Sequence, residues 1–392
     1  MNEEIFDKKR ECPYRGKCGA CQTLNLTYGE ELSLKMRQEI QLLGRFGHVE
    51  EIIPMENPEH YRAKVQYITL YNGGRVNFGL YRSSDGGIVR IDKCLMEDET
   101  ASRVARIAKK TADKLGLSFY DGKRGLVRHF MVRRAAETGE VLCAVVTSDE
   151  KFDKAQEFAR ELAARCHEVT AVSRIINDTR TPMLMNGEEY VILGKGYITD
   201  KLCGCEFRIS AKSFYQINPR QTEVLYRVAA EMADLDGTER VADAYCGIGT
   251  VGITAVKNSR GNGVKLSGFD INPDAVRDAE KNAELNGIKN AEFRCISDGG
   301  FALREEKKPD VLFMDPPRAG CDKRFLSSVL AVKPNKIVYI SCAPDTLARD
   351  LAFLKQAYKI EKIQPVDMFP GTRHVETVVL LSKAERKAAY RD

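Results

Sequence analysis

The chain has 392 residues, of which 43% are hydrophobic and 30% are charged. This balance is typical of a globular protein and excludes a fibrous or disordered chain. At roughly 150 residues per domain, the length predicts two or three domains. The net charge of +5 is too small to indicate a nucleic-acid binder by itself. No apolar run approaches the roughly 18 residues of a membrane span, and the charged amino terminus does not resemble a signal peptide. We therefore expect a cytoplasmic protein without membrane contact.

Twelve cysteines are many for a chain expected in a reducing compartment. Disulfides are rare there, so the expected roles are metal ligands, a nucleophile or small buried side chains. Cys12, Cys18 and Cys21 follow a C-x5-C-x2-C spacing, and Cys94 comes later in the chain. Four thiolates are suited to zinc or to an iron–sulfur cluster, and the ligand type alone does not decide between them.

The first half of the chain predicts mixed secondary structure. Residues 30–46 have apolar positions at helical spacing, and residues 61–82 alternate like a β-hairpin with its turn at 72–74. Residues 103–134 hold ten Lys or Arg against two acids, which makes this the one strongly basic segment. Short strands around one helical run follow between 140 and 215, as in a compact α+β module.

The pattern changes after residue 218. A helix at about 219–233 precedes repeated strand and helix units, which predict a doubly wound, Rossmann-like parallel sheet. We expect three regions: 1–100 with the cysteine-rich segment and the hairpin, 101–214 as a smaller central α+β region, and 215–392 as the α/β domain.

A glycine-rich turn opens this last region. Gly247, Gly249 and Gly252 lie between a predicted strand and a predicted helix, and Asp270 ends the next strand. Backbone N–H groups at such a helix start suit a nucleotide-like ligand, and an acid at the position of Asp270 can accept ribose hydroxyls. This pattern is shared by nicotinamide and S-adenosylmethionine enzymes. Asp243, just before the turn, favours the methyl donor, because its carboxylate can face the amino-acid end that a dinucleotide lacks.

Three further residues are predicted at the same edge of the sheet. Asp315 follows a strand and precedes two prolines, which make a rigid loop. Cys342 ends an apolar strand at the start of a helix, where the helix dipole is expected to lower the thiol pKa. Glu376 enters the final apolar strand, where burial is expected to raise its pKa and make it a candidate base, with His374 as the alternative.

These residues resemble the RNA uracil-C5 methyltransferases, which make 5-methyluridine in 23S ribosomal RNA or transfer RNA. The matching motifs run in the family's order over nearly the whole chain: YRAKVQ (61–66), SFYQIN (213–218), DAYCGIGT (243–250), DPPR (315–318), SCAPDTLARD (341–350) and HVE (374–376).

The resemblance implies a mechanism and a set of site residues. Cys342 would add to uracil C6, C5 would take the methyl group from S-adenosylmethionine, and Glu376 would remove the C5 proton. The target base would be flipped out or single-stranded. The residues implied to contact the methyl donor are Gln216, Tyr245, Thr250, Asp270, Asp298 and Asp315.

The resemblance also implies that Cys12, Cys18, Cys21 and Cys94 bind a 4Fe-4S cluster, because many of these enzymes carry this arrangement. The cluster cysteines favour ribosomal RNA over transfer RNA as the substrate. Several family members have a β-barrel RNA-binding domain ahead of the cysteines, and only eleven residues precede Cys12 here. We therefore expect residues 103–134 to bind RNA, with Arg128, His129 and Phe130 offering charge beside a stacking aromatic ring.

Two other functions remain open from the residues. The glycine-rich turn and the cysteines also suit an NAD-dependent iron–sulfur oxidoreductase, and a non-catalytic RNA-binding protein could retain the same scaffold. The presence of both Cys342 and Glu376 speaks against the second of these.

Overall fold

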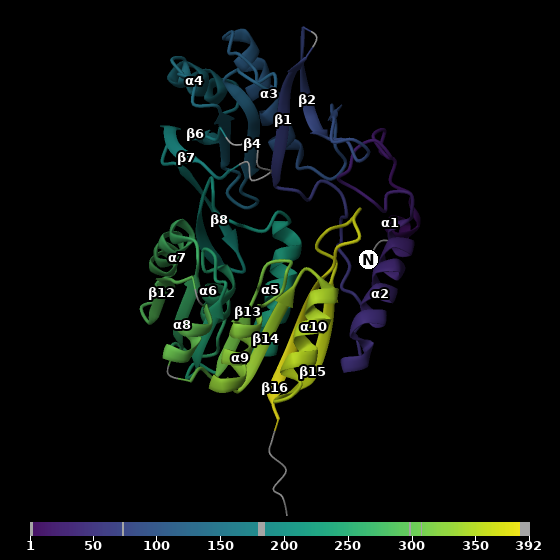
Figure 1. Cartoon of the computed structure of the whole chain (residues 1–392), viewed down its shortest axis with the longest axis vertical. Helices are drawn as coiled ribbons and strands as arrows, with labels where there is room; N and C mark the ends of the chain where they lie inside the picture. Colours follow the sequence, from purple (N-terminus) through teal and green to yellow (C-terminus); the bar gives the residue numbers. More distant parts are fainter. Residues whose placement is uncertain (1–2, 73, 179–184, 298, 307, 385–392) are drawn as a thin grey trace, which may run out of the picture.

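The computed structural model describes residues 3–72, 74–178, 185–297, 299–306 and 308–384. Two seven-stranded sheets and one two-stranded sheet form its framework. Figure 1 shows the first large sheet in the upper part of the molecule and the second in the lower part.

The first sheet has the strand order β3-β2-β1-β4-β5-β6-β7. Helices α3 (Glu99–Lys114) and α4 (Ala155–Arg165) pack on one of its faces. Because β1 pairs with both β2 and β4, the expected boundary at residue 100 falls inside the segment that builds one sheet. The strands are β1 (Lys64–Asn72), β2 (Arg75–Tyr81), β3 (Ile88–Arg90), β4 (Val127–Arg134), β5 (Val141–Thr147), β6 (Val169–Ile176) and β7 (Glu188–Leu193).

The amino-terminal helices belong with the lower part of the molecule. Helix α1 (Glu3–Asp7) precedes α2 (Tyr28–Leu43), which begins at a capping box of Thr27 and Glu30 and is followed by the 3-10 turn η1 (Gly44–Phe46). Helix α2 contacts α10 (Pro344–Leu354) and β15 (Tyr358–Val366) near the carboxyl end of the chain. The segment before the hairpin is thus bound to elements more than 300 residues away.

The second sheet has the order β12-β11-β10-β13-β14-β16-β15. Its first five strands are parallel, whereas β16 runs antiparallel to both β14 and β15. The strands are β10 (Arg240–Ala244), β11 (Lys265–Asp270), β12 (Ala291–Cys295), β13 (Val311–Met314), β14 (Lys336–Ser341), β15 and β16 (Glu376–Lys383).

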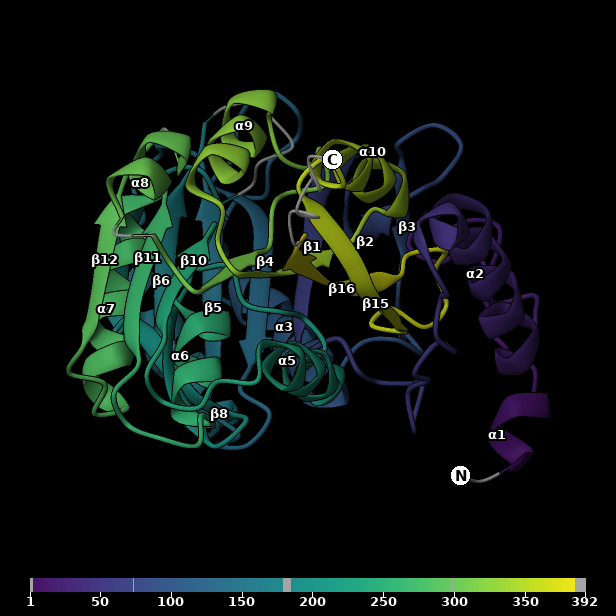
Figure 2. The ribbon, with the colours of Figure 1, turned by 90° about the horizontal axis from the view of Figure 1, so that it is seen from below.

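Helices cover both faces of this sheet, which confirms the predicted doubly wound fold. Seen from below in Figure 2, α5, α6 and α7 lie on one side and α8, α9 and α10 on the other. The two faces form separate apolar cores. The helices not yet bounded are α5 (Pro219–Ala233), α6 (Thr250–Lys257), α7 (Pro273–Leu285), α8 (Gly299–Glu305) and α9 (Lys323–Val332), and the hairpin of β8 (Tyr197–Leu202) and β9 (Cys205–Ser210) precedes them.

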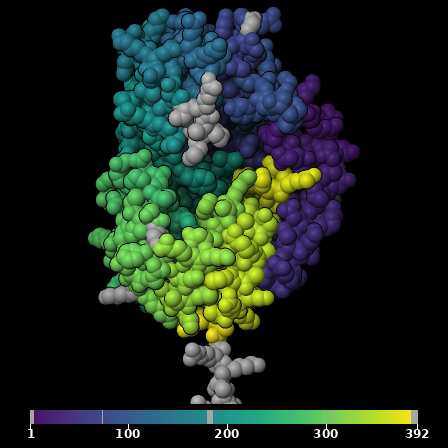
Figure 3. Space-filling model, viewed as in Figure 1, coloured from purple at the N-terminus to yellow at the C-terminus, as the bar shows by residue number. Residues whose placement is uncertain are grey.

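One edge of the second sheet collects the predicted site residues. The carboxyl ends of the parallel strands meet at one edge of the sheet. In such folds a ligand binds at this edge, at the point where the strand order reverses. Here the order reverses at β10, which lies between β11 and β13. Because β16 is antiparallel, its first residue, Glu376, lies at this same edge. Figure 3 shows a hollow between the upper part of the molecule and this edge. Among the described residues, no helix is long and apolar enough to cross a membrane.

Candidate active site

The glycine-rich turn between β10 and α6 brings backbone atoms very close together. Tyr245, Gly247 and Gly249 have left-handed φ angles of 62°, 54° and 82°, which favours glycine at the last two positions. Gly252 N–H donates to Asp243 Oδ2 at 2.9 Å. A Cβ at Gly252 would stand only 2.7 Å from that oxygen. The turn therefore requires glycine at 252 and aims the start of α6 at the sheet edge.

Two carboxylates flank this turn. Asp270, at the end of β11, accepts from the N–H groups of Gly247 at 3.0 Å and Asn272 at 2.8 Å. Asp243 Oδ1 is buried and has no hydrogen-bond partner in the described part of the chain. Burial raises the pKa of Asp243 to about 7. Asp243 thus keeps an unused acceptor, which suits a cationic group of a bound ligand.

Two other predicted ligand-contacting residues lie at the same turn. Thr250 is the first residue of α6, and its Oγ1 is 3.0 Å from the hydroxyl of Tyr226. The ring of Tyr245 packs against Phe325 with 5.3 Å between ring centroids. Both side chains are thereby held at the sheet edge. The predicted Asp298 lies outside the described residues.

Gln216 lies in the segment 213–218, which joins the two parts of the molecule. Ser213 Oγ donates to Asp278 Oδ2 on α7 at 2.6 Å. Asn218 Nδ2 donates to the backbone oxygen of Met368 at 2.8 Å. The buried Gln216 lies between these two anchored residues in the sequence, so its backbone is fixed from both sides.

Asp315 and Glu376 lie close enough to Cys342 to influence its thiol electrostatically. Burial raises the pKa of Cys342 to about 11, and the nearby carboxyl groups of Glu376 and Asp315 add to this rise. Burial also raises the pKa of Glu376 well above its usual range, with Asp315 contributing, and raises that of Asp315 to about 7. The structure therefore brings the predicted nucleophile and the predicted base to one site.

The expectation of a lowered Cys342 pKa is wrong for this structure. Cys342 does precede α10, as predicted, but burial and two neighbouring acids raise the thiol pKa more than the helix dipole lowers it. A partial charge at a helix end contributes at most about 2 kcal/mol, whereas desolvation of a buried ionisable group shifts its pKa by several units.

His374 is less suited to act as the base than Glu376. Arg318 donates a hydrogen bond to His374 Nε2 at 3.1 Å, which leaves this ring nitrogen occupied. Partial burial and the charge of Arg318 lower the pKa of His374. Glu376, in contrast, is buried and has a raised pKa, as the sequence predicted.

Comparison with known proteins identifies the family. A family model described as tRNA (Uracil-5-)-methyltransferase matches residues 27–384. The chain belongs to this family. As a family member it is an RNA methyltransferase, and membership favours this prediction over the NAD-dependent oxidoreductase.

Relatives and a solved structure agree with this family. A protein of Clostridium tetani called an uncharacterized RNA methyltransferase is 39% identical, over 95% of this chain and 82% of its own length. A Bacillus cereus protein with the same description is 37% identical, over 98% of this chain and 85% of its own length. The crystal structure of the Pyrococcus abyssi tRNA (uracil-54, C5)-methyltransferase with S-adenosyl-L-homocysteine has a TM-score of 0.77 and 28% identity, and the match covers 95% of this chain and 87% of that one.

In this methyltransferase, the three residues of the basic segment that were expected to face RNA, 128–130, lie inside the fold, contrary to expectation. Phe130 is completely buried in the core beside α3 and α4, and Arg128 and His129 are also buried. Arg128 lies over the ring of Tyr120, 4.6 Å from its centroid. These side chains offer no exposed stacking surface, because β4 is a central strand with both faces covered.

The four amino-terminal cysteines of the methyltransferase lie near one another. Burial raises the pKa of Cys21 to about 11, and the nearby Cys18 and Cys12 thiols add to this rise. Burial likewise raises that of Cys94 to about 12, with Cys21 among the smaller contributors. Within the described residues, however, no group of three or more His, Cys, Asp or Glu side chains is arranged to hold a metal ion. The four predicted cysteine ligands therefore lie close together, but their arrangement in the described structure is not that of a metal site.

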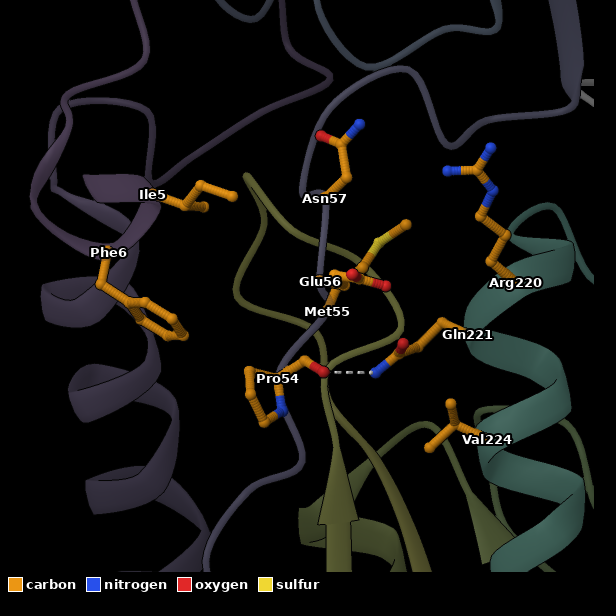
Figure 4. Close-up of a pocket in the computed structure, with 9 residues that line it drawn as sticks. All are labelled: Ile5, Phe6, Pro54, Met55, Glu56, Asn57, Arg220, Gln221 and Val224. Carbon is orange, nitrogen blue, oxygen red and sulfur yellow. Dashed lines mark hydrogen bonds between the residues drawn. The ribbon is translucent and has the colours of Figure 1, made fainter. Parts of the chain in front are cut away.

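A cavity of about 700 Å³ lies away from the predicted residues. Figure 4 shows it between α1, residues 54–57 and the start of α5, with Gln221 Nε2 donating to the backbone oxygen of Pro54 at 3.2 Å. None of the predicted site residues that the structure describes lines it.

Sequence reasoning missed the charged face of α2. Glu31, Lys35 and Glu39 are spaced four residues apart, so they share one face of the helix. All three are buried. Their spacing was visible in the sequence, but charged residues at helical spacing usually lie in solvent, and the pattern alone gave no reason to place them inside.

Proposed function

We propose that this enzyme methylates uridine C5 in RNA, with S-adenosylmethionine as the methyl donor. The observation that carries the proposal is the position of Cys342, Asp315 and Glu376 at one sheet edge, where both carboxyl groups raise the pKa of the thiol. A nucleophile and a base at one site are what substitution at a weakly nucleophilic ring carbon requires.

The residues of this chain perform the covalent steps. After losing its proton, Cys342 Sγ bonds to uracil C6, and the C5=C6 electron pair moves to give an enolate with a nucleophilic C5. Bound S-adenosylmethionine supplies the electrophilic methyl group. Glu376 then takes the C5 proton, the C5=C6 double bond reforms, and the bond from Cys342 breaks. A carboxyl group with a raised pKa suits this step, because it holds the abstracted proton more readily than an exposed glutamate would.

The glycine-rich turn supports a methyl-donor site. Asp243 has a buried, unused oxygen beside the start of α6, which fits the ammonium group at the amino-acid end of S-adenosylmethionine. Tyr245, Thr250 and Asp270 surround the same turn. We assign the residues of this turn, together with Gln216 and Asp315, to binding and orienting the methyl donor.

The experiment is incubation with tritiated S-adenosylmethionine and RNA, followed by nucleoside analysis. Label in 5-methyluridine supports the proposal, whereas label in adenine or cytosine refutes it. RNA containing 5-fluorouridine adds a test of the mechanism. Fluorine at C5 cannot leave as a proton, so a covalent adduct with the wild type should persist and should be lost in Cys342→Ala.

For the RNA itself we propose 23S ribosomal RNA, supported by the cysteine arrangement. Transfer RNA is the second candidate, since the family description and the Pyrococcus abyssi enzyme name it. Parallel assays with unmodified 23S RNA and unmodified tRNA separate the two. The exposed Lys110, Lys123 and Arg124 remain suited to phosphate contacts. Replacing all three by Gln should reduce the salt dependence of RNA binding.

We also propose that Cys12, Cys18, Cys21 and Cys94 bind a 4Fe-4S cluster. Their proximity and thiolate chemistry support it. Such a cluster would supply a covalent brace, since methyl transfer needs no electron. Anaerobic reconstitution should give about four irons per chain, and Cys94→Ser should lower this number. Zinc in place of iron and sulfide would refute the assignment.

A further inference from the structure

The segment between β15 and β16 leads directly into Glu376 and is held by helix α2. Asp367 begins this segment. Its Oδ1 accepts from Lys35 Nζ at 2.6 Å, and its Oδ2 accepts from the hydroxyl of Tyr28 at 2.7 Å. Lys35 Nζ also donates to the backbone oxygen of Phe369 at 3.2 Å. Two side chains of α2 therefore bind the first turn of the segment.

A second set of bonds holds the middle of the segment. Gly371 N–H donates to Glu31 Oε1 at 2.9 Å. The other end of the same carboxylate is paired with Arg10, and Lys35 Nζ lies 2.7 Å from Glu31 Oε1. In Figure 4 the faint yellow ribbon of this region passes between α2 and α5. We call Glu31, Lys35 and Asp367 the α2 clasp.

The clasp is a buried charge network rather than a surface salt bridge. The side chains of Glu31, Lys35 and Asp367 are 0%, 1% and 0% exposed. Replacing such a network by apolar side chains is often neutral or stabilising, so burial of ions is weak evidence for stability. What the clasp does provide is one fixed arrangement of the backbone from Asp367 to Gly371, because each bond has a defined direction and partner.

We propose that the α2 clasp consists of positioning residues that set the place of the Glu376 carboxyl relative to uracil C5. The inference rests on the proposed role of Glu376 as the base. Glu376 follows Gly371 by five residues, and α2 also reaches the next residue of β16, because Thr377 Oγ1 donates to Glu39 at 2.7 Å. Within the described structure, the bonds of the clasp residues lead to other partners than Cys342, so the clasp should affect proton removal and leave the earlier steps intact.

Lys35→Met is the decisive variant, because methionine keeps most of the side-chain volume and removes the charge. Misplacing a reacting group by about 1 Å can cost about 100-fold, so turnover on uridine RNA should fall by roughly 10- to 100-fold. Adduct formation with 5-fluorouridine RNA ends before proton removal, so its rate should stay near that of wild type. On uridine RNA, the variant should accumulate a covalent adduct that the wild type does not.

Lys359→Met is the matched control. Lys359 pairs with Glu361 at 2.6 Å on β15 but is 71% exposed, so turnover and adduct formation should both match wild type. Tyr28→Phe is the milder companion variant. It removes one bond to Asp367 and keeps the ring, so it carries the test if Lys35→Met does not fold, as judged by thermal unfolding.

The outcomes are distinguishable. Slow turnover with normal adduct formation supports the clasp. Wild-type turnover in a folded Lys35→Met or in Tyr28→Phe overturns it, and so does an equal loss of turnover and adduct formation, which would show general disruption. If the wild type itself forms no adduct with 5-fluorouridine RNA, the proposed function fails instead.

Discussion

Glu39→Gln tests whether a buried carboxyl group on α2 is destabilising at alkaline pH. Glu39 is 0% exposed, it accepts from Thr377 Oγ1 at 2.7 Å, and its other oxygen has no partner in the described structure. Burial raises its pKa from 4.5 to about 7. Between these two values the folded protein keeps a proton that the unfolded chain has released, so rising pH favours unfolding. At 1.36 kcal/mol per pKa unit, the full effect is about 3 kcal/mol.

The measurement is denaturant unfolding of wild type and Glu39→Gln at several pH values. Glutamine does not ionise, so the stability of the variant minus that of wild type should increase by about 3 kcal/mol between about pH 4.5 and about pH 8. Any constant cost of burying an amide cancels in this comparison, and other titrating groups are present in both proteins. A difference that is flat with pH would refute the reasoning, because Glu39 would then titrate alike in the folded and unfolded states.

Three further predictions concern the reaction. Glu376→Gln should keep adduct formation with 5-fluorouridine RNA but lose about 100- to 10,000-fold in turnover, whereas Cys342→Ala should lose both, as read by denaturing gels and nucleoside analysis. Gly252→Ala should weaken S-adenosylmethionine binding in calorimetry by about tenfold, because its Cβ would stand 2.7 Å from Asp243 Oδ2; unchanged affinity would contradict this. Wild-type affinity for S-adenosylmethionine should rise from about pH 6 to about pH 8 as Asp243, with a pKa of about 7, ionises, and Asp243→Asn should flatten this rise.

The second sheet was predictable because its sequence signals are local. The helix that opens this region was expected at about 219–233, which are the bounds of α5 in the structure. Short apolar runs between helices with clear start and stop signals leave few alternative assignments of secondary structure. The antiparallel β16 was not predicted, since strand direction depends on the connection and not on the strand's own residues. Nor could periodicity show that β1 pairs with β4 across more than 50 residues.

For the candidate site, too, the positions of the residues could be predicted better than their surroundings. Cys342 and Asp315 each directly follow a strand and Glu376 begins one, so the sheet topology alone brings them to one edge. The apolar strand did indicate the burial of Glu376. The pKa of Cys342 was expected in the wrong direction because it also depends on Asp315 and Glu376, which come from other strands and do not show in the local sequence of the cysteine. Phe130 shows the converse error: a basic stretch with an aromatic residue indicated RNA contact, but the strand that carries it lies in the middle of a sheet.

The acids of the candidate site have raised pKa values, which a bound cation would change. Asp243, Asp315, Glu376 and Cys342 are all acids whose pKa values are raised by burial, and the carboxyl group of Asp315 adds to the rise at the other three. A cation bound among such groups lowers their pKa values, because it favours each charged form. S-adenosylmethionine carries a sulfonium and an ammonium group, so its binding should make the thiol of Cys342 easier to deprotonate. For the proposed nucleophile Cys342, methyl-donor binding before attack on uracil would therefore favour the more reactive thiolate.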